Sequence, residues 1–367
     1  MPHLSIFFSS LNGINKVGSL HQMLGIYKKF IQAGWEVTFY TNEMAHTLPD
    51  IGFEAKVYSQ WPHFLPENLG ALYQFFMPLL RFGSGQKTDV IISEPAYAVS
   101  AAINAGKLWG AKVVARCGMV YGESAETLKK SGKSANKKLR REKKMFKNAD
   151  KCIIPTAALA DWVVNNYKIN REKIVIAPNN VDTELFKPAA NTKKDIDIIC
   201  IGRLVAKKRH DLLLEVLAET NYKIEIIGQG KMEQQLVNIA DRVSAEVVLI
   251  RRVENDMLPE HLNRSKIYVN IAAWEGHPKA LIEAMSCGLA CIGAKSPGIK
   301  NLIVDGQTGL LVEPEPKQIR SAIERLLADE QLREYLGKNA REYAVRHFSL
   351  DTVFEIYRRT CESLISK

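Results

Sequence analysis

Apolar runs with strand character alternate with helix-like stretches along the chain, and the alternation begins again after residue 195. This order is typical of a parallel sheet covered by helices. A length of 367 residues also favours two domains over a single core. We therefore predict an α/β protein with two facing, doubly wound parallel-sheet domains. The runs are "LSIFFSS", "EVTFYTN", "AKVYS", "DVIISEP", "KVVARCG" and "KCIIPT" in the first half, and "DIDIICIGRL", "KIEIIGQG", "EVVLIRR", "KIYVNIAA", "LACIGAK" and "GLLVEP" in the second.

The polar, proline-bearing stretch "NNVDTELFKPAANTKKD" separates the two series and is interpreted as a linker. We predict domains over 1–190 and 191–349, and a last helix over about 350–367, with Ser349 as its N-cap, that packs back on the first domain. Each half opens with a buried strand, a glycine-bearing loop and a helix, but neither loop is a G-x-G-x-x-G dinucleotide fingerprint. Ligands of such sheets bind beyond the carboxyl ends of the strands, which predicts a site in the cleft between the domains.

Several features bear on where the protein works. The chain lacks the roughly 20 continuous apolar residues of a membrane span, and its start lacks the pattern of a signal peptide. Six scattered cysteines without C-x-x-C pairs indicate reduced thiols, not structural zinc or disulfides. We predict a cytoplasmic protein.

The net charge is +10, and much of the excess lies in residues 129–151, "KKSGKSANKKLRREKKMFKNADK". Two interpretations stand side by side: a solvated loop and helix, or attachment to an anionic membrane surface, where each basic residue adds about 1 kcal/mol. The second would place the protein peripherally at the inner face of the cell membrane. Nucleic acid is not an expected partner, because the stretch has no interleaved aromatic residues and matches no DNA-binding motif.

The loop "GRLVAKKRHDLLL" carries a phosphate-binding pattern. Gly202 ends a strand and lets the chain turn, and Arg203 and Lys208 flank the loop before a helix. A helix N-terminus with two cations suits phosphate groups. The alternative is a solvated basic loop.

The stretch "WEGHPKALIEAMSCG" places Glu275 in a tight loop and Glu283 on the following helix. Pro278 suits the first helical position, and Gly288 supplies the stop. Each carboxylate can accept from a pair of sugar hydroxyls, with a diphosphate on the amides between them, which describes a nucleotide-sugar. Taken alone, either glutamate is better explained as a solvated or helix-capping residue.

Four segments then carry a family resemblance. "EGHPKALIEAMSCG" looks like the signature of glycosyltransferase family 4, with two glutamates separated by seven residues. "GRLVAKK", "IAPNNVDTELFKP" and "DGQTGLLVEP" are similar to further motifs of that family, in the same order. The resemblance implies a GT-B fold of two Rossmann-like domains, the first for the acceptor and the second for the donor. It also implies retaining transfer from a nucleotide-diphosphate sugar without a metal or other cofactor.

Carried over by residue, the resemblance implies that Arg203 and Lys208 stabilise the leaving diphosphate, that Glu275 positions the sugar and that Glu283 binds the ribose. These make Arg203, Lys208 and Glu275 the expected catalytic residues. Backbone groups near Arg252 and Val253 would meet the base. The expected donor-binding residues are Gly13, Gly202, Gly228, Arg252, Val253, Gly276, His277, Pro278, Lys279, Ala280, Leu281 and Glu283.

The chain departs from the family pattern at several positions. Asn180 and Arg209 stand where glycine is usual, and Asn301 where glutamate is. Arg116 lies where many members have a histidine near the reacting sugar. The acceptor-side candidates are Arg116, Tyr121 and Glu123, for which buried structural roles are equally expected.

The predicted function is hexose transfer from a UDP- or GDP-sugar to a saccharide or lipid-linked acceptor, in the biosynthesis of cell-surface polysaccharide, lipopolysaccharide or glycolipid. The alternatives are a nucleotide-sugar 2-epimerase of similar fold and a catalytically silent nucleotide-sugar-binding protein.

Overall fold

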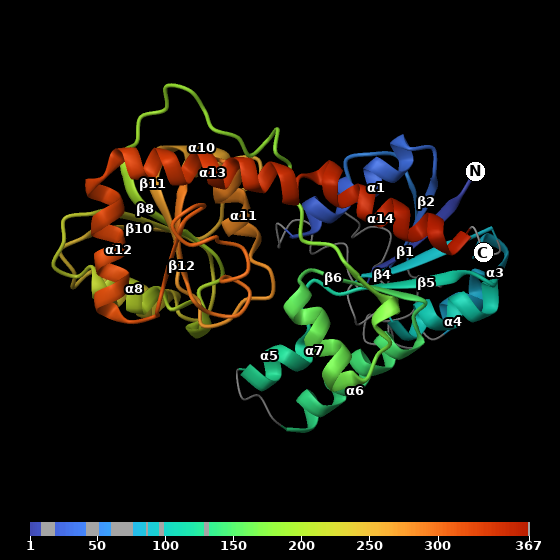
Figure 1. Ribbon diagram of the computed structural model, residues 1–367. Helices are drawn as coiled ribbons and strands as arrows, with labels where there is room; N and C mark the ends of the chain where they lie inside the picture. The colour runs from blue at the N-terminus through green and yellow to red at the C-terminus, as the bar shows by residue number, and fades with distance from the viewer. Residues whose placement is uncertain are drawn as a thin grey trace. The chain divides into compact units, whose positions relative to one another are not determined.

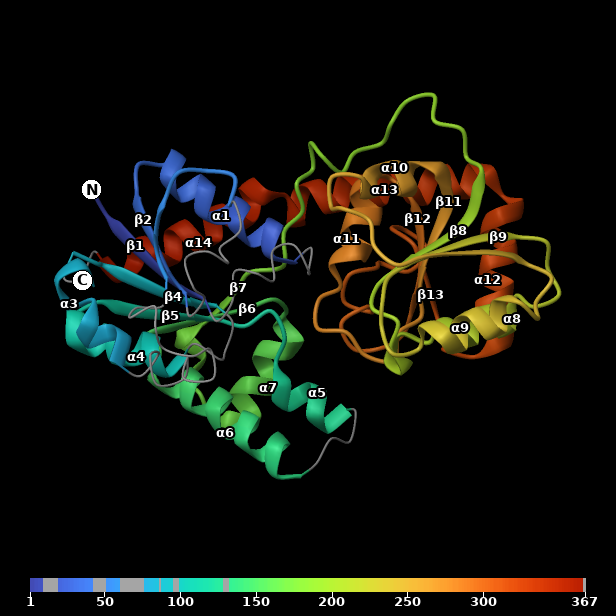
Figure 2. The ribbon, with the colours of Figure 1, turned by 180° about the vertical axis from the view of Figure 1, so that it is seen from behind.

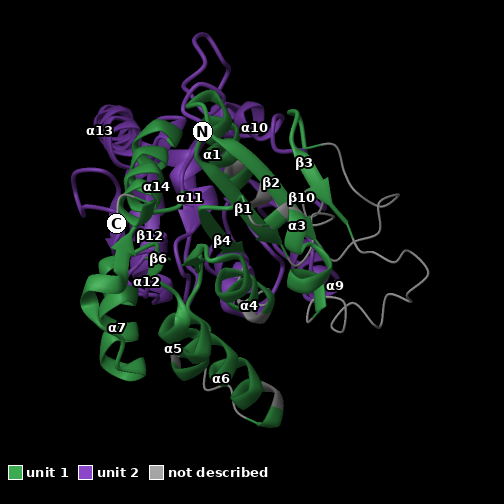
Figure 3. Cartoon of the chain, turned by 90° about the vertical axis from the view of Figure 1, so that its right-hand side faces the viewer, with its two compact units in different colours: residues 1–179, 350–367 green, residues 180–349 purple. Residues whose placement is uncertain are grey.

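The computed structural model describes residues 1–8, 19–41, 51–59, 76–85, 87–94, 99–127 and 132–365. The chain forms two compact units (Figures 1 and 3). Unit 1 comprises Met1–Asn179 with Leu350–Lys367, and unit 2 comprises Asn180–Ser349. Each unit is built on a parallel sheet with helices on both faces, so the predicted class of two doubly wound α/β domains is confirmed.

Unit 1 has a seven-stranded sheet in the order β3-β2-β1-β4-β5-β6-β7. Every pair of neighbouring strands is parallel, with Ile6 of β1 between Phe39 of β2 and Ile92 of β4. The winding direction therefore reverses between β1 and β4. The strands are β1 (His3–Phe8), β2 (Glu36–Thr41), β3 (Lys56–Tyr58), β4 (Val90–Glu94), β5 (Lys112–Arg116), β6 (Lys151–Ile154) and β7 (Ile174–Ile176).

Helices cover both faces of this sheet because alternate strand residues are apolar on each side. One core joins β1, β4 and β5 to α4, α6 and α7 (Figure 2). The other joins them to α1 and to the last helix α14, which lie side by side (Figure 1). The predicted C-terminal helix thus packs on the first unit. The helices are α1 (Ser19–Gln32), α3 (Phe82–Gly85), α4 (Val99–Trp109), α5 (Tyr121–Thr127), α6 (Lys133–Asn148), α7 (Ala157–Tyr167), the 3₁₀ turn η3 (Arg171–Lys173) and α14 (Leu350–Ile365).

Unit 2 has a six-stranded parallel sheet in the order β10-β9-β8-β11-β12-β13, which reverses between β8 and β11. Helices α8, α9 and α12 pack on one face, and α10, α11 and α13 on the other. Its strands are β8 (Ile196–Ile201), β9 (Lys223–Ile227), β10 (Glu246–Ile250), β11 (Ser265–Asn270), β12 (Ala290–Ala294) and β13 (Leu310–Val312). Its helices are the 3₁₀ turn η4 (Ala206–Lys208), α8 (His210–Val216), α9 (Glu233–Ala240), α10 (Leu258–Arg264), α11 (Lys279–Ser286), α12 (Pro316–Ala328) and α13 (Glu330–Phe348).

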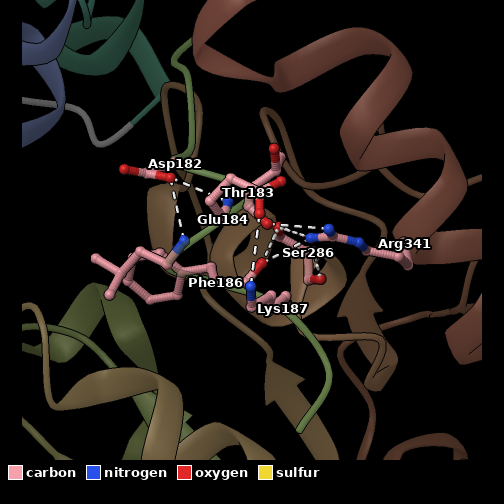
Figure 4. Close-up of polar contacts among 8 residues, drawn as sticks. Asp182, Thr183, Glu184, Phe186, Lys187, Ser286 and Arg341 are labelled. Carbon is pink, nitrogen blue, oxygen red and sulfur yellow. Dashed lines mark hydrogen bonds and ion pairs between the residues drawn. The ribbon is translucent and has the colours of Figure 1, made fainter.

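The segment predicted as a linker is docked on unit 2 over much of its length. Phe186 is 1% exposed, and the Arg341 guanidinium of α13 donates to the carbonyl oxygens of Thr183 (2.9 Å), Phe186 (2.7 Å) and Ser286 (2.8 Å) (Figure 4). The Ser286 hydroxyl also donates to the Phe186 carbonyl at 2.5 Å. The boundary between the units consequently lies after Asn179, earlier than the predicted position after residue 190.

Candidate functional site

Two loops of unit 2 meet where its sheet reverses. Strands β8 and β11 are parallel neighbours, so their carboxyl ends lie at one edge, and the loops that follow them begin side by side. The Ala273 amide donates to the Lys207 carbonyl oxygen at 2.8 Å and ties the loops together. The reversal point of an open parallel sheet is the usual position of its ligand site.

The loop after β8 packs so closely against the loop after β9 that Gly228, in the second loop, has no room for a side chain. A Cβ on Gly228 would lie 1.9 Å from the Gly202 carbonyl oxygen, and a Cβ on Gly202 would lie 3.0 Å from Lys208 Nζ. The Leu204 amide donates to the Gln229 carbonyl oxygen at 3.0 Å, which holds the loop on its neighbour after β9.

The same loop continues through η4 into α8. Arg209 has φ 56°, the left-handed conformation in which glycine is favoured, so this position would suit a glycine. His210, the first residue of α8, is buried. Burial, followed by the charge of Lys208, lowers the pKa of His210 to about 4. His210 is therefore neutral at pH 7, and the positive charge of the loop belongs to its lysines and arginines.

The Glu275 carboxylate lies between two ammonium groups. Lys208 Nζ bonds Glu275 Oε1, and Lys207 Nζ lies 3.8 Å from Oε2. The side chains of Glu275, Lys207 and Lys208 are 10%, 17% and 13% exposed, so this charged group is largely withdrawn from water. Charge-assisted hydrogen bonds are stronger than neutral ones. The structure thus brings together two of the three predicted catalytic residues.

A glycine that sequence reasoning missed shapes the Glu275 loop. Gly298 has φ +85°, and a Cβ there would lie 2.2 Å from the Glu275 carbonyl oxygen. The Glu275 amide donates to the Pro297 carbonyl at 3.0 Å. The "SPG" turn after β12 therefore holds the Glu275 loop from behind, and its proline-glycine pair was the available signal.

Helix α11 carries the second glutamate. Pro278 is its N-cap and not its first residue, so the helix begins one residue later than predicted, and Gly288 has φ +73° just past its end. Glu283 is 4% exposed, and the His277 ring packs edge-on against Phe348 with centroids 5.5 Å apart. The remaining residues of the predicted donor set here, Gly276, Lys279, Ala280 and Leu281, belong to the same turn and the start of the helix.

Tyr268 on β11 is a buried tyrosine whose pKa is affected by both glutamates. Burial raises the pKa of its hydroxyl well above the ordinary value, and Cys200, Cys291, Glu275 and Glu283 act in the same direction. Both carboxylates are therefore within electrostatic reach of one core residue. The spacing of the motif along the sequence did not identify this tyrosine.

Arg203, the third predicted catalytic residue, and the residues predicted to meet the base lie in different surroundings, and one predicted donor residue lies outside the described part. Arg203 is exposed, and Arg252 pairs with Glu254 at 2.9 Å in solvent. Val253 packs on the core beneath α10 and α11. Gly13 lies outside the described residues.

The Arg116 side chain is turned into the interior of unit 1. It donates to Asn179 Oδ1 at 2.7 Å and to the Tyr357 hydroxyl at 3.2 Å, and its Nε lies 3.6 Å from Glu94 Oε1. Through these contacts, Arg116 on β5 links β4, α14 and Asn179, the last residue of unit 1 before the chain enters unit 2. Its acceptor-side role stays a prediction.

Tyr121 and Glu123 lie on α5, which the buried Glu142 carboxylate of α6 holds at its start. Glu142 accepts from the amides of Tyr121 (2.6 Å) and Gly122 (2.9 Å) and from the Tyr167 hydroxyl (2.6 Å). Burial raises the pKa of Glu142. Both candidates are half-buried, and nothing in this arrangement distinguishes acceptor contact from structure.

Within the described ranges, no cluster of three or more His, Cys, Asp or Glu side chains has the geometry of a metal site. The six cysteines are buried free thiols.

The architecture of the two units is that of the GT-B class. Sucrose-phosphate synthase from Thermosynechococcus elongatus superposes with a TM-score of 0.83 at 18% identity, covering 100% of both chains. The Anabaena protein HepE, solved in complex with UDP-glucose, superposes with a TM-score of 0.79 at 16% identity, covering 99% of this chain and 100% of its own.

Sequence comparison identifies the family. Residues 181–343 match the family described as Glycosyl transferases group 1, and residues 21–185 match Glycosyltransferase Family 4. The chain therefore belongs to glycosyltransferase family 4. A phosphatidylinositol N-acetylglucosaminyltransferase chain from Arabidopsis thaliana is 30% identical over 165 residues, which are 42% of this chain and 37% of that relative. The chain spans 37% to 61% of the length of three curated relatives that it matches.

Proposed function

We propose that the protein is a retaining glycosyltransferase that moves a hexose from a nucleotide-diphosphate sugar to a saccharide or lipid-linked acceptor. The observation that carries the proposal is the pairing of Lys208 with Glu275 at the reversal point of the unit 2 sheet. A cation suited to a phosphate and a carboxylate suited to sugar hydroxyls lie side by side there. A nucleotide-sugar presents both groups next to each other.

In the proposed complex, Lys208 and Arg203 face the diphosphate and stabilise the charge that develops on it as the glycosidic bond breaks. Pre-positioned cations cost little reorganisation, and removing one comparable group typically slows catalysis by about 100-fold to 1,000-fold. These side chains would supply the charge stabilisation that a metal supplies in other enzymes, so we propose that transfer needs no metal.

The two glutamates would hold the two polyols of the donor. Glu275 accepts from sugar hydroxyls, and the buried Glu283 accepts from the ribose. An ionised carboxylate only accepts hydrogen bonds, so paired hydroxyls are its natural ligand. With the sugar and acceptor held in place, positioning lowers the barrier further. Base contacts would come from the backbone near Arg252 and Val253.

The relatives support the choice of donor and acceptor classes. HepE was solved with UDP-glucose, and the Arabidopsis relative is named for transfer to phosphatidylinositol. We propose a UDP- or GDP-sugar as donor and a lipid-linked or saccharide acceptor in polysaccharide or glycolipid biosynthesis.

A donor screen tests this proposal. We expect UDP or GDP sugars to raise the melting temperature, because a ligand at 100 times its Kd stabilises a fold by about 2.7 kcal/mol. We also expect release of the nucleotide only when an acceptor is added. Ring epimerisation without an acceptor would instead identify a 2-epimerase, and tight donor binding without any transfer would identify a silent binding protein.

We further propose that residues 129–151 bind an anionic membrane surface. Helix α6 contains eight Lys and Arg residues and a single acid, Glu142. Glu142 is 2% exposed and faces the core, so the outward face of α6 carries positive charge alone. No helix in the described ranges is long and apolar enough to cross a bilayer.

Replacing Lys137, Lys138, Arg140 and Arg141 with glutamine should weaken binding to phosphatidylglycerol vesicles at least tenfold, since each charge contributes about 1 kcal/mol. Cosedimentation at low and high salt measures this. The control neutralises four equally exposed cations of unit 2, Lys193, Lys317, Arg325 and Lys338, and should bind as the wild type does. Equal loss in both variants, or binding indifferent to salt, would remove the membrane proposal.

A further inference from the structure

Lys207 contacts the candidate site but has no role in the function proposed above. It is adjacent to Lys208 in η4, and the two ammonium groups approach different oxygens of the same carboxylate. Lys208 bonds Glu275 Oε1, whereas Lys207 Nζ lies 3.8 Å from Oε2. The carboxylate therefore has a second cation within reach.

The proposed function makes conflicting demands on Lys208. In the structure, Lys208 is bonded to Glu275, whereas the proposed function requires its ammonium group at the diphosphate. The Glu275 side chain is only 10% exposed, so water has little access to take the place of the Lys208 ammonium group. A buried charge that loses its partner is strongly destabilised. Lys208 can move freely to the phosphate only if another group takes over the carboxylate.

The contacts of Lys207 hold its ammonium group beside Trp274. Its Nζ lies 4.6 Å from the centre of the Trp274 ring and 3.5 Å from the Trp274 carbonyl oxygen. Trp274 is 1% exposed, so close packing holds its ring in place. The hydrogen bond from the Ala273 amide to the Lys207 carbonyl oxygen fixes the backbone from which the side chain extends. An ammonium over an aromatic face is attracted to it, which favours this position over the solvent.

We propose that Lys207 is a positioning residue that takes over the Glu275 carboxylate when Lys208 turns to the diphosphate. Lys207 thereby keeps the Glu275 carboxylate paired with a cation and aimed at the donor sugar, and it offsets the electrostatic cost of releasing Lys208. The inference rests on the proposed function, because it assumes that a nucleotide diphosphate binds at this loop.

A double-mutant cycle tests the proposal with UDP and GDP as probes, measured by isothermal titration calorimetry. In the wild-type background, Lys207→Met should weaken binding of whichever probe the protein takes by about tenfold, and Lys207→Arg should restore most of it. In a Glu275→Gln background, Lys207→Met should change the affinity less than twofold, because no carboxylate then retains Lys208. Lys317→Met, an exposed lysine of α12, is the matched control and should bind as the wild type does.

The cycle separates the alternatives. Equal loss in both backgrounds would show that Lys207 contacts the phosphate directly or supports the loop generally, and it would overturn the proposal. No loss in either background would overturn it as well. Wild-type protein that binds neither probe would instead remove the proposed function itself, and this inference with it. Circular dichroism of each variant verifies that the fold is retained.

Discussion

Replacing Lys208 with alanine should lower kcat/KM for sugar transfer by at least a hundredfold, which is roughly 3 kcal/mol of transition-state stabilisation. The variant loses a cation that faces the leaving diphosphate, and Lys207 cannot replace it without abandoning Glu275. The loss should appear mainly in kcat, because charge on the diphosphate increases as the bond breaks.

Steady-state assays with the donor found in the screen measure this effect. Lys317→Ala removes a charge from the surface of the same unit and should leave kcat/KM unchanged. Lys208→Arg keeps the charge but changes its geometry, and intermediate activity is expected. Turnover of Lys208→Ala close to that of the wild type would refute the assignment of this loop as the diphosphate site.

Replacing Arg341 with alanine should lower the free energy of unfolding of unit 2 by about 3 kcal/mol. Its guanidinium donates to three backbone carbonyl oxygens, and the Phe186 and Ser286 carbonyls lie in a buried region. A hydrogen bond from a charged donor contributes about 1.5–3 kcal/mol, and carbonyls left without partners add a desolvation cost. The segment from Thr183 to Phe186 should then detach from α11 and α13.

Urea unfolding followed by circular dichroism gives the size of the loss, and hydrogen exchange of residues 181–187 shows where it occurs. Lys338→Ala lies on the same helix with an exposed side chain, and its effect should stay within about 0.5 kcal/mol. A change below about 1 kcal/mol in Arg341→Ala would mean that apolar packing of Phe186 holds the segment by itself.

Most strands could be predicted because strands of a parallel sheet are buried on both faces and form continuous apolar runs. Each of the twelve predicted runs overlaps an observed strand. The exception among the described strands is β7, which has only three residues, "IVI", and lies at the sheet edge. Three residues are too few for a pattern to separate from a loop.

Two features escaped local reasoning for the same physical reason. The segment after Asn179 is polar and contains proline, so it resembles a free linker, yet Arg341 binds it from 155–158 residues away. Glu142 lies in a basic run that looks uniformly solvated, yet its carboxylate is buried and accepts hydrogen bonds from α5 and α7. Partners this distant leave no mark on the local sequence.

The sequence by itself determined the order of strands and helices, the turns at Gly202 and Gly288, and the identity of Lys208 and the two glutamates as candidates. These depend on periodicity, backbone conformation and side-chain chemistry, which are local properties. Only the tertiary structure decided that Lys207, Lys208 and Glu275 share one charged group, although Lys208 and Glu275 are 67 residues apart in the chain. That meeting follows from the winding of the sheet, which makes β8 and β11 neighbours and brings the loops at their carboxyl ends together.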